Sequence, residues 1–297
     1  MATFPRRKAK SNVAQFPKAL RAKNSLRPSY QDDDEDDGAV RPSLRRRGVY
    51  LLPNAFTTAA LFCGFYAIVM AMNLKFDYAS IAIFAAMVLD SLDGRVARMT
   101  NTQSEFGAQY DSLSDMVSFG AAPALVVYEW SLRGMGKLGW LAAFVYCAGA
   151  ALRLARFNTN ITVVDKRYFQ GLPSPAAAAL VAGFVWIMDD LGFVGADLNW
   201  VAWGITLYAG LTMVTNVPFY SFKDINLRKP VPFIAAFVVV LILVIISSAP
   251  SKVLFGLFVL YGLSGLGVYF WRLFKGKPVS ILQTEHEPDH EHEREDR

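Results

Sequence analysis

The sequence predicts an all-α membrane protein: a polytopic bundle of about eight transmembrane helices with a disordered tail at each end. Hydrophobic residues make up 54% of the 297 residues, and the mean hydropathy is +0.28, which is too apolar for an ordinary soluble domain. The apolar residues occur in blocks that are long enough to cross about 30 Å of hydrocarbon. Both ends of the chain are instead polar and charged. These observations together indicate one membrane domain between two tails.

Composition divides the chain into four segments. Residues 1–40 are rich in Lys, Arg, Pro and Ser and contain an acidic run. They cannot bury enough apolar surface to offset chain entropy, so we expect a disordered cytosolic tail. Residues 41–49 form a basic juxtamembrane segment, which suits both a topology signal and a short interfacial helix. The membrane domain covers residues 50–274, and residues 275–297 form a second disordered cytosolic tail.

Apolar runs separated by short polar loops define the predicted spans. We predict eight runs that are long enough to span roughly 30 Å of hydrocarbon. The runs cover about residues 50–72, 78–100, 106–129, 138–157, 175–190, 200–216, 231–248 and 252–273. Tryptophan residues lie near the ends of several runs, as is typical of the membrane–water interface.

The basic residues of the loops indicate the orientation. One side of the membrane receives most of the Lys and Arg, whereas the other receives only Lys75, Arg133, Lys137 and Lys252. Because basic loops stay in the cytosol, we expect a protein of the cytoplasmic (inner) membrane with both termini and the active site on the cytosolic side. The net charge of +5 lies in the tails and loops. It therefore indicates contact with membrane lipids, and we expect no nucleic acid partner.

Four aspartates lie inside two neighbouring apolar runs. A charged side chain near the middle of a membrane helix costs roughly 2.5–3.5 kcal/mol, so this group must be compensated. Helical spacing places the acids and small residues on two stripes. The first stripe comprises Asp90, Asp93 and Ala97, and the second comprises Gly107, Asp111 and Asp115. If the two stripes face each other, the four carboxylates converge.

Carboxylate ligands alone favour a hard cation such as Mg²⁺, Mn²⁺ or Ca²⁺ over zinc. Two such ions would balance four carboxylates, and a pair of ions is a known clamp for attack at phosphorus. Two alternatives remain open. Arg95 and Arg98 could neutralise one or two of the acids as structural ion pairs. Membrane prenyltransferases also bind diphosphate through aspartates, although their two motifs normally lie far apart in sequence.

The string D-x2-D-G-x2-A-R-x8-G-x3-D-x3-D spans residues 90–115 and resembles the signature of the CDP-alcohol phosphatidyltransferases at every fixed position. The resemblance implies two divalent cations, Mg²⁺ or Mn²⁺, that hold the diphosphate of a CDP-linked lipid. It implies Asp90, Asp93, Asp111 and Asp115 as metal ligands, with Asp115 also the general base. It further implies that the nucleotide is bordered by Gly94, Ala97, Arg98, Gly107, Asn54 and Thr57. For Asn54 and Thr57, a plain helix-start pattern is the alternative.

Flanking segments point to one branch of this family. Residues 52–57, 118–123, 151–158 and 169–175 resemble the membrane-integral phosphatidylserine synthases, and the likeness extends over about residues 45–275. This resemblance implies CDP-diacylglycerol and L-serine as substrates, phosphatidylserine and CMP as products, and a homodimer.

The residues also favour serine on chemical grounds. Arg153 and Arg156 lie three residues apart near the predicted cytosolic end of an apolar run. Guanidinium groups bind carboxylates well, and serine brings a carboxylate whereas choline and inositol do not. Diphosphate binding and a salt bridge to Asp111 or Asp115 are alternatives for these arginines. The further serine-binding candidates at the same level are Asn158, Ser118 and Ser174.

Other functions remain open at this stage. The same chemistry could use glycerol 3-phosphate, choline or inositol as the acceptor. The acids could instead form the ion path of an ion-coupled transporter, which would release no CMP. A third alternative is a lipid-binding membrane protein without catalytic activity, against which the intact Asp115 argues.

Overall fold

The structure is a computed structural model that describes residues 44–159, 168–220 and 233–275. The predicted tails lie outside these residues, except for Lys275, and so does the first part of the basic segment 41–49. Within the described ranges, the helices are α1 (Leu44–Met72), α2 (Phe76–Thr100), α3 (Glu105–Asp115), α4 (Ala122–Trp130), α5 (Lys137–Thr159), α6 (Ser174–Asp190), α7 (Asn199–Val214), α8 (Phe233–Ser248) and α9 (Pro250–Phe274).

The helices follow the predicted apolar runs closely. The run at 106–129 is a continuous helix in which a π-helical segment, Met116–Ala121, joins α3 to α4. We call this segment the π turn. Short 3₁₀ turns, Leu132–Met135 and Gly195–Leu198, lead into α5 and α7. The expected helical bundle is therefore confirmed in outline.

Length and composition identify fewer spans than the sequence predicted. Among the described residues, three helical stretches are long and apolar enough to cross a membrane: Leu52–Met72, Lys137–Thr159 and Pro250–Tyr269. Phe237–Ser248 is apolar but shorter. The aspartates make the ends of α2 and α3 too polar to qualify as simple spans, and α7 has only 16 residues. A protein with membrane helices is supported, while the number eight stays a prediction.

One element departs from the all-α expectation. Strands β1 (Tyr168–Gln170) and β2 (Pro218–Tyr220) form a short antiparallel pair, with Phe169 opposite Phe219. The chain can turn out of this pair because Gly171 has a φ of +76°, and a side chain at this position would collide with the Met213 carbonyl. The N–H of Gly171 also donates to the Val217 carbonyl at 2.9 Å. The strand pair thus ties the start of α6 to the end of α7.

Small residues let the helices approach closely. Ala60, Ala67 and Ala71 of α1 and Ala79 and Ala86 of α2 are buried at 0–2% exposure. In membranes, where lipid is as apolar as a leucine side chain, such residues favour association because they allow extensive van der Waals contact. α6 is the most enclosed helix, since nearly every residue from Ala176 to Val185 is buried. It contacts α2, α4, α7 and α9 and forms the centre of the bundle.

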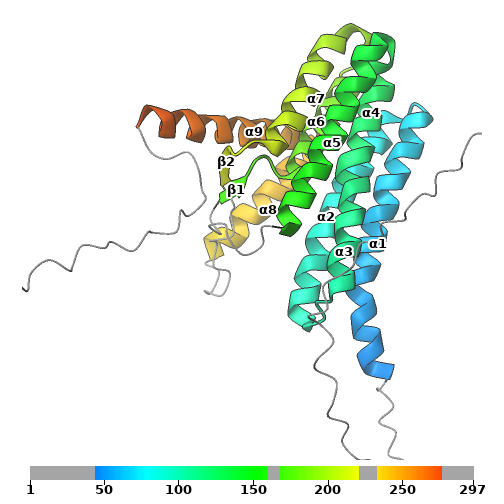
Figure 1. Cartoon of the computed structure of the whole chain (residues 1–297), viewed down its shortest axis with the longest axis vertical. Coiled ribbons are helices and arrows are strands. Elements are labelled where there is room, and N and C mark those ends of the chain that lie inside the picture. The colour runs from blue at the N-terminus through cyan, green and yellow to red at the C-terminus, as the bar shows by residue number, and fades with distance from the viewer. Residues whose placement is uncertain (1–43, 160–167, 221–232, 276–297) are drawn as a thin grey trace, which may run out of the picture. The chain divides into compact units, whose positions relative to one another are not determined.

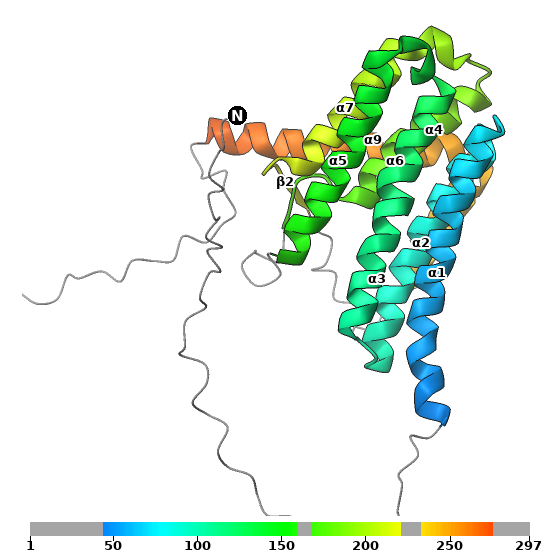
Figure 2. The same cartoon turned by 45° about the vertical axis from the view of Figure 1, so that its right-hand side comes forward.

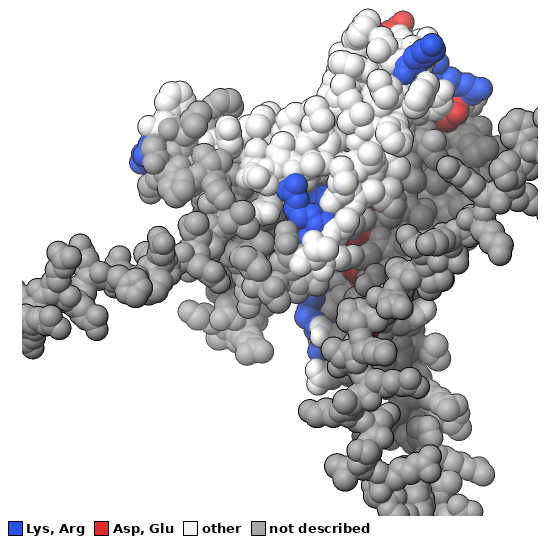
Figure 3. All heavy atoms as spheres, viewed as in Figure 1, with Lys and Arg blue, Asp and Glu red and all other residues white. Residues whose placement is uncertain are grey.

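The last two helices pack differently from the rest. Figures 1 and 2 show α9 crossing the direction of α5, α6 and α7 at a steep angle, with α8 beside it. α8 is exposed along nearly its whole length, and its residues are almost all apolar. Figure 3 shows a broad uncharged surface over the described helices, with charged side chains confined to a few places. Such a surface suits contact with lipid.

Candidate metal and active site

The four aspartates come together where the end of α2 meets α3. One carboxylate oxygen each from Asp90, Asp93 and Asp111 can be chosen so that all three lie within 4.8 Å of one another. Asp90 also lies close to Asp111 and Asp115. The two acidic stripes therefore face each other, which is the condition under which the four carboxylates were expected to converge. We call these four residues the acid cluster.

Local capping explains why α3 folds back along α2. α2 ends at Asn101, which takes a left-handed conformation with a φ of 51° while its N–H bonds to the Ala97 carbonyl. α3 then begins after Ser104, whose hydroxyl accepts a hydrogen bond from the Gly107 N–H at 3.0 Å. Such a side-chain acceptor satisfies one of the free N–H groups at a helix start. The resulting short connection turns the two acidic stripes toward each other.

α1 supports the cluster from the side. The hydroxyl of Thr57 lies 2.8 Å from Asp93 Oδ2 and donates to it, and both side chains are buried, at 4% and 5% exposure. Ser114, next to Asp115, donates to the Thr57 carbonyl at 3.2 Å. Partners of this kind orient a carboxylate that serves as a metal ligand. Thr57 was expected beside the nucleotide, and its bond to Asp93 was not anticipated from the sequence.

The cluster has the character of a cation site. Asp111 Oδ1 is buried and has no hydrogen-bond partner, although a buried carboxylate oxygen needs one. The one ion pair among the described residues, Arg133–Glu129 at 2.9 Å, involves none of the four acids. Arg95 and Arg98 are exposed, so the alternative of structural ion pairing does not account for the cluster. Oxygen donors that form no ion pair within the described residues fit a divalent cation such as Mg²⁺ or Mn²⁺.

Of the residues expected to border the nucleotide, Gly94, Ala97, Arg98 and Gly107 lie on the same helices as the acids, and Asn54 and Thr57 lie on α1. A Cβ at Gly94 would lie 3.7 Å from the guanidinium of Arg98, so this arginine reaches back over the glycine. A Cβ at Gly107 would lie 3.5 Å from Asn54 Oδ1, which brings α1 against the start of α3. Ala97 is half-buried on the same stripe as Asp93. Small residues thus leave space beside the acids, while nucleotide contact itself stays a prediction.

The two candidate arginines of α5 differ in their surroundings. Arg153 donates to Ser174 Oγ at 2.9 Å, and its Nε is buried without a hydrogen-bond partner. Its charge interacts with Asp115 and with Tyr261 of α9. Arg156 donates to Asn216 Oδ1 at 3.1 Å. Neither arginine forms an ion pair with the acids among the described residues, so the predicted alternative of a salt bridge is not seen there.

The remaining serine-binding candidates have partners within the protein. Asn158 donates to Ser112 Oγ at 3.0 Å, which links α5 to the residue after Asp111. Ser118 is fully buried, and its hydroxyl donates to the Ala60 carbonyl at 3.1 Å. Ser174 lies beside Arg153 at the buried start of α6. Of these candidates, Ser174 is thus the one that lies next to a guanidinium group, that of Arg153, with an unused N–H donor.

Two further interhelical contacts, each made by a tyrosine hydroxyl, were not predicted from the sequence. One hydrogen bond of 2.9 Å joins the hydroxyls of Tyr110 and Thr58 and links α3 to α1 beside the acids. Tyr146 of α5 donates to the Phe119 carbonyl within the π turn at 3.0 Å. The sequence around Tyr146 gives no sign of its partner, because that partner is a backbone atom on another helix.

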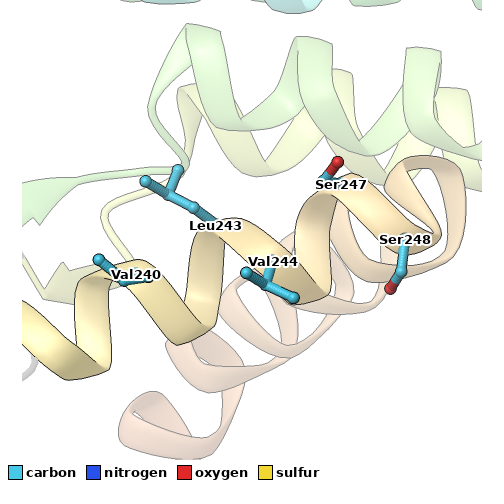
Figure 4. A pocket seen from close by; sticks show the side chains of 5 residues that line it. All are labelled: Val240, Leu243, Val244, Ser247 and Ser248. Carbon is cyan, nitrogen blue, oxygen red and sulfur yellow. The ribbon is translucent and has the colours of Figure 1, made fainter.

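A hollow on the surface of α8 does not compete with the acid cluster. Figure 4 shows its lining, which comes from this one helix: Val240, Leu243, Val244, Ser247 and Ser248. It offers no ionisable side chain and no strong metal ligand. We therefore assign no chemistry to it.

Known proteins resemble this chain over the same region. The sequence model of the family described as CDP-alcohol phosphatidyltransferase matches residues 50–215. The CDP-diacylglycerol–serine O-phosphatidyltransferase of Helicobacter pylori strain J99 is 34% identical over 215 residues, which are 72% of this chain and 90% of that protein. The protein of the same name from Mycobacterium tuberculosis strain H37Rv is 34% identical over 203 residues, 66% of this chain and 70% of that protein. One from Saccharomyces cerevisiae is 38% identical over 152 residues, 44% of this chain and 54% of that protein.

The chain therefore belongs to the CDP-alcohol phosphatidyltransferase family, a class of transferases of phospholipid synthesis, and the match includes the whole acid cluster. Relatives from bacteria and yeast carry the name CDP-diacylglycerol–serine O-phosphatidyltransferase. The resemblance that the aspartate signature indicated is thus confirmed at the level of the family.

Proposed function

We propose that this chain transfers a phosphatidyl group from CDP-diacylglycerol to L-serine and forms phosphatidylserine and CMP. The observation that carries the proposal is the convergence of Asp90 and Asp93 of α2 with Asp111 of α3, whose carboxylate oxygens can lie within 4.8 Å of one another. The similarity to enzymes named for this reaction supports both the lipid donor and the serine acceptor.

The acid cluster would hold two divalent cations, Mg²⁺ or Mn²⁺. Two observations on the described residues support this assignment: Asp111 Oδ1 has no hydrogen-bond partner among them, and none of the four acids forms an ion pair with them. When bound, the ions would neutralise negative charge on the diphosphate and on the departing CMP. Asp90, Asp93, Asp111 and Asp115 supply the ligand oxygens. Thr57 holds Asp93 in one orientation through its hydroxyl.

Asp115 acts as the general base. An alcohol is a poor nucleophile at neutral pH, and a carboxylate placed to accept its proton contributes about 10²–10⁴-fold to the rate. Asp115 takes the proton of the serine hydroxyl, whose oxygen forms a bond to the phosphorus that carries diacylglycerol. The bond between that phosphorus and the CMP oxygen breaks, and CMP leaves with the electron pair. The contact of Asp115 with Asp90 keeps the base beside the metal ligands.

Arg153 binds the serine carboxylate. Its buried Nε has no hydrogen-bond partner among the described residues, whereas its Nη1 donates to Ser174. A carboxylate acceptor would satisfy that N–H, and a guanidinium binds such a group with paired hydrogen bonds. Arg156 is already engaged by Asn216, so we assign it to the structure of the α7–β2 connection. Asn158, Ser118 and Ser174 remain secondary candidates for contact with serine.

Replacing each arginine tests this assignment. Arg153→Met should raise the apparent KM for serine about tenfold or more, because charge-assisted hydrogen bonds contribute about 1.5–3 kcal/mol. Arg156→Met is the matched control and should leave that KM within about twofold, since its partner Asn216 belongs to the protein. An unchanged KM for serine in both variants would remove the arginines from the serine site.

The nucleotide of the donor binds beside the acid cluster. It is bordered by Gly94, Ala97, Arg98 and Gly107, with Asn54 and Thr57 of α1 beside them.

The active site faces the cytosol. The acyl chains of the donor stay in lipid while serine arrives from the cytosol. Both termini lie on the cytosolic side of the inner membrane, as the distribution of basic loops supports. The chain forms a homodimer, which cross-linking in native membranes would test.

The central experiment measures CMP release from CDP-diacylglycerol by the purified protein, with and without Mg²⁺ or Mn²⁺. Serine should support release, and glycerol 3-phosphate, inositol and choline are the competing acceptors. Asp115→Asn should lower the rate by about 10²–10⁴-fold, as expected for loss of a general base. Asp197→Asn, which changes an exposed aspartate in the 3₁₀ turn before α7, should leave the rate unchanged.

Two results would contradict parts of this proposal. Full activity of Asp115→Asn would exclude this residue as the base. Ion flux in sealed vesicles without CMP release would identify a transporter instead.

A further inference from the structure

The π turn has a cause in the sequence. Proline has no N–H, and its ring clashes with the carbonyl four residues earlier in an α-helix. In this helix Pro123 lies four residues after Phe119, so the regular bond to the Phe119 carbonyl cannot form. The helix widens over Met116–Ala121, and the Ala122 N–H instead bonds to the Val117 carbonyl, five residues back. π turns of this kind occur frequently at functional sites.

The π turn separates two faces that a regular helix would merge. In steps of four residues, the stripe Gly107, Asp111 and Asp115 would continue through Phe119 and Pro123 into the buried face of α4. One residue added to a turn rotates the two parts relative to each other by about 100°. α4 is fixed because five of its first six residues are buried in the core. The direction of Asp115, directly before the π turn, therefore depends on how that turn is held.

Tyr146 supplies a hydrogen-bond donor to the Phe119 carbonyl, which cannot accept a bond from Pro123. Its side chain is 0% exposed, and its hydroxyl donates to the Phe119 carbonyl at 3.0 Å. A buried carbonyl without a donor is costly, so this bond stabilises the widened turn and ties it to α5. The donor comes from α5, the helix that also carries Arg153.

A second contact holds the π turn from the opposite side. Ser118 donates to the Ala60 carbonyl of α1 at 3.1 Å. A side chain at Gly64 would put its Cβ 2.5 Å from Ser118 Oγ, so α1 and the π turn are in direct contact here. The π turn is thus fixed between α1 and α5 by one hydroxyl on each side.

We propose that Tyr146 is a positioning residue for the reaction: its bond to the Phe119 carbonyl holds the π turn and thereby aims Asp115 at the acid cluster. The proposal rests on the function proposed above, in which Asp115 is the base. Tyr146 itself touches neither substrate. Its effect should therefore fall on the chemical step and leave substrate binding unchanged.

Tyr146→Phe removes the hydroxyl and keeps the ring. We expect kcat, measured as CMP release at saturating Mg²⁺, to fall about tenfold, because small displacements of a catalytic group cost one to two orders of magnitude in rate. The KM values for CDP-diacylglycerol and for serine should stay within about twofold of the native values, since neither substrate contacts Tyr146.

Tyr208→Phe is the matched control. Tyr208 of α7 also donates from its hydroxyl to a backbone carbonyl on another helix, that of Gly262 on α9, at 2.8 Å. This bond involves no residue of α2, α3 or the π turn. Both variants should lower the melting temperature by similar amounts, but Tyr208→Phe should keep its kcat. Equal kcat values for the two variants would overturn the proposed role of Tyr146. If the native enzyme is active in the same assay, the proposed function is unaffected by that result.

Ser118→Ala provides an independent test, which also decides the case if Tyr146→Phe does not fold. It removes the hydroxyl on the α1 side and adds no bulk beside Gly64. A lower kcat with an unchanged KM for serine supports the role of the π turn. If Ser118→Ala keeps the kcat of the native protein, or raises only the KM for serine, the proposed role of the π turn is contradicted. Absence of CMP release by the native protein would instead contradict the proposed function.

Discussion

α2 has two halves that differ in what they bury. The first half, from Phe76 to Ala86, places Ala79, Ala82, Ile83 and Ala86 in the core. In the second half only Asp93 is buried, and Asp90 lies half-buried beside it. The same helix therefore packs densely at one end and leaves space between polar groups at the other.

This difference teaches how a membrane bundle can hold an acidic site. Close packing of small residues between α1 and α2 fixes the helix axes, so the acids need not contribute to the packing themselves. At the site end, the polar groups must instead be satisfied by hydrogen bonds or by a bound cation. A substitution in the site half should change activity, and one in the packing half should change stability.

Asp93→Asn should have the largest effect on activity. It removes a ligand oxygen charge and weakens the bond that Thr57 donates. We expect the rate of CMP release to fall about 10³-fold, as for loss of a group that positions catalytic metal. Mg²⁺ should raise the melting temperature of the native protein, because a bound ligand stabilises the folded state, and this rise should shrink in the variant.

Chelation supplies the matching control for this prediction. EDTA should abolish CMP release by the native protein and lower its melting temperature, and added Mg²⁺ should restore both. If Mg²⁺ has the same effect on the melting temperature of Asp93→Asn as on that of the native protein, Asp93 is not a metal ligand.

Thr57→Val should have an intermediate effect. The change keeps the shape of the side chain but removes the hydroxyl that donates to Asp93 at 2.8 Å. Loss of such an outer partner typically lowers metal affinity or activity about 10–100-fold. Titrating Mg²⁺ against the initial rate should show a higher half-saturating concentration.

Thr206→Val controls for the loss of a buried threonine hydroxyl. Thr206 is 0% exposed and bonds to the Ala202 carbonyl of its own helix at 2.7 Å, in a contact that involves none of the acids. Its Mg²⁺ requirement should match that of the native protein. If Thr57→Val and Thr206→Val both require more Mg²⁺ than the native protein, or if neither does, the hydroxyl of Thr57 has no specific role in metal binding.

Ile83→Val should have the smallest effect, because it trims one methyl group in the packing half. Ile83 is 1% exposed, and such truncations cost about 0.5–1.5 kcal/mol of stability. We expect a slightly lower melting temperature in detergent and native kcat and KM values. A marked loss of kcat would show that packing and catalysis are not divided between the two halves of α2.

Much of the site could be predicted from the sequence because helical periodicity fixes which side chains share a face. Asp90 and Asp93, and likewise Asp111 and Asp115, lie on common stripes wherever their helices form. The apolar runs located the helices, and the aspartate signature indicated the family. Such properties depend on neighbours within about two helical turns, so no knowledge of the tertiary arrangement was needed.

Contacts between distant segments were decided only by the tertiary structure. The bond from Thr57 to Asp93 joins residues 36 positions apart. The bonds from Tyr146 to Phe119 and from Ser118 to Ala60 are accepted by backbone carbonyls. Because every residue carries a backbone carbonyl, the residue type does not indicate which one accepts the bond. Arg153 and Arg156 look equivalent in sequence and differ because Ser174 meets one and Asn216 meets the other. The sequence by itself thus determined which acids can act together, and packing between helices decided what orients them.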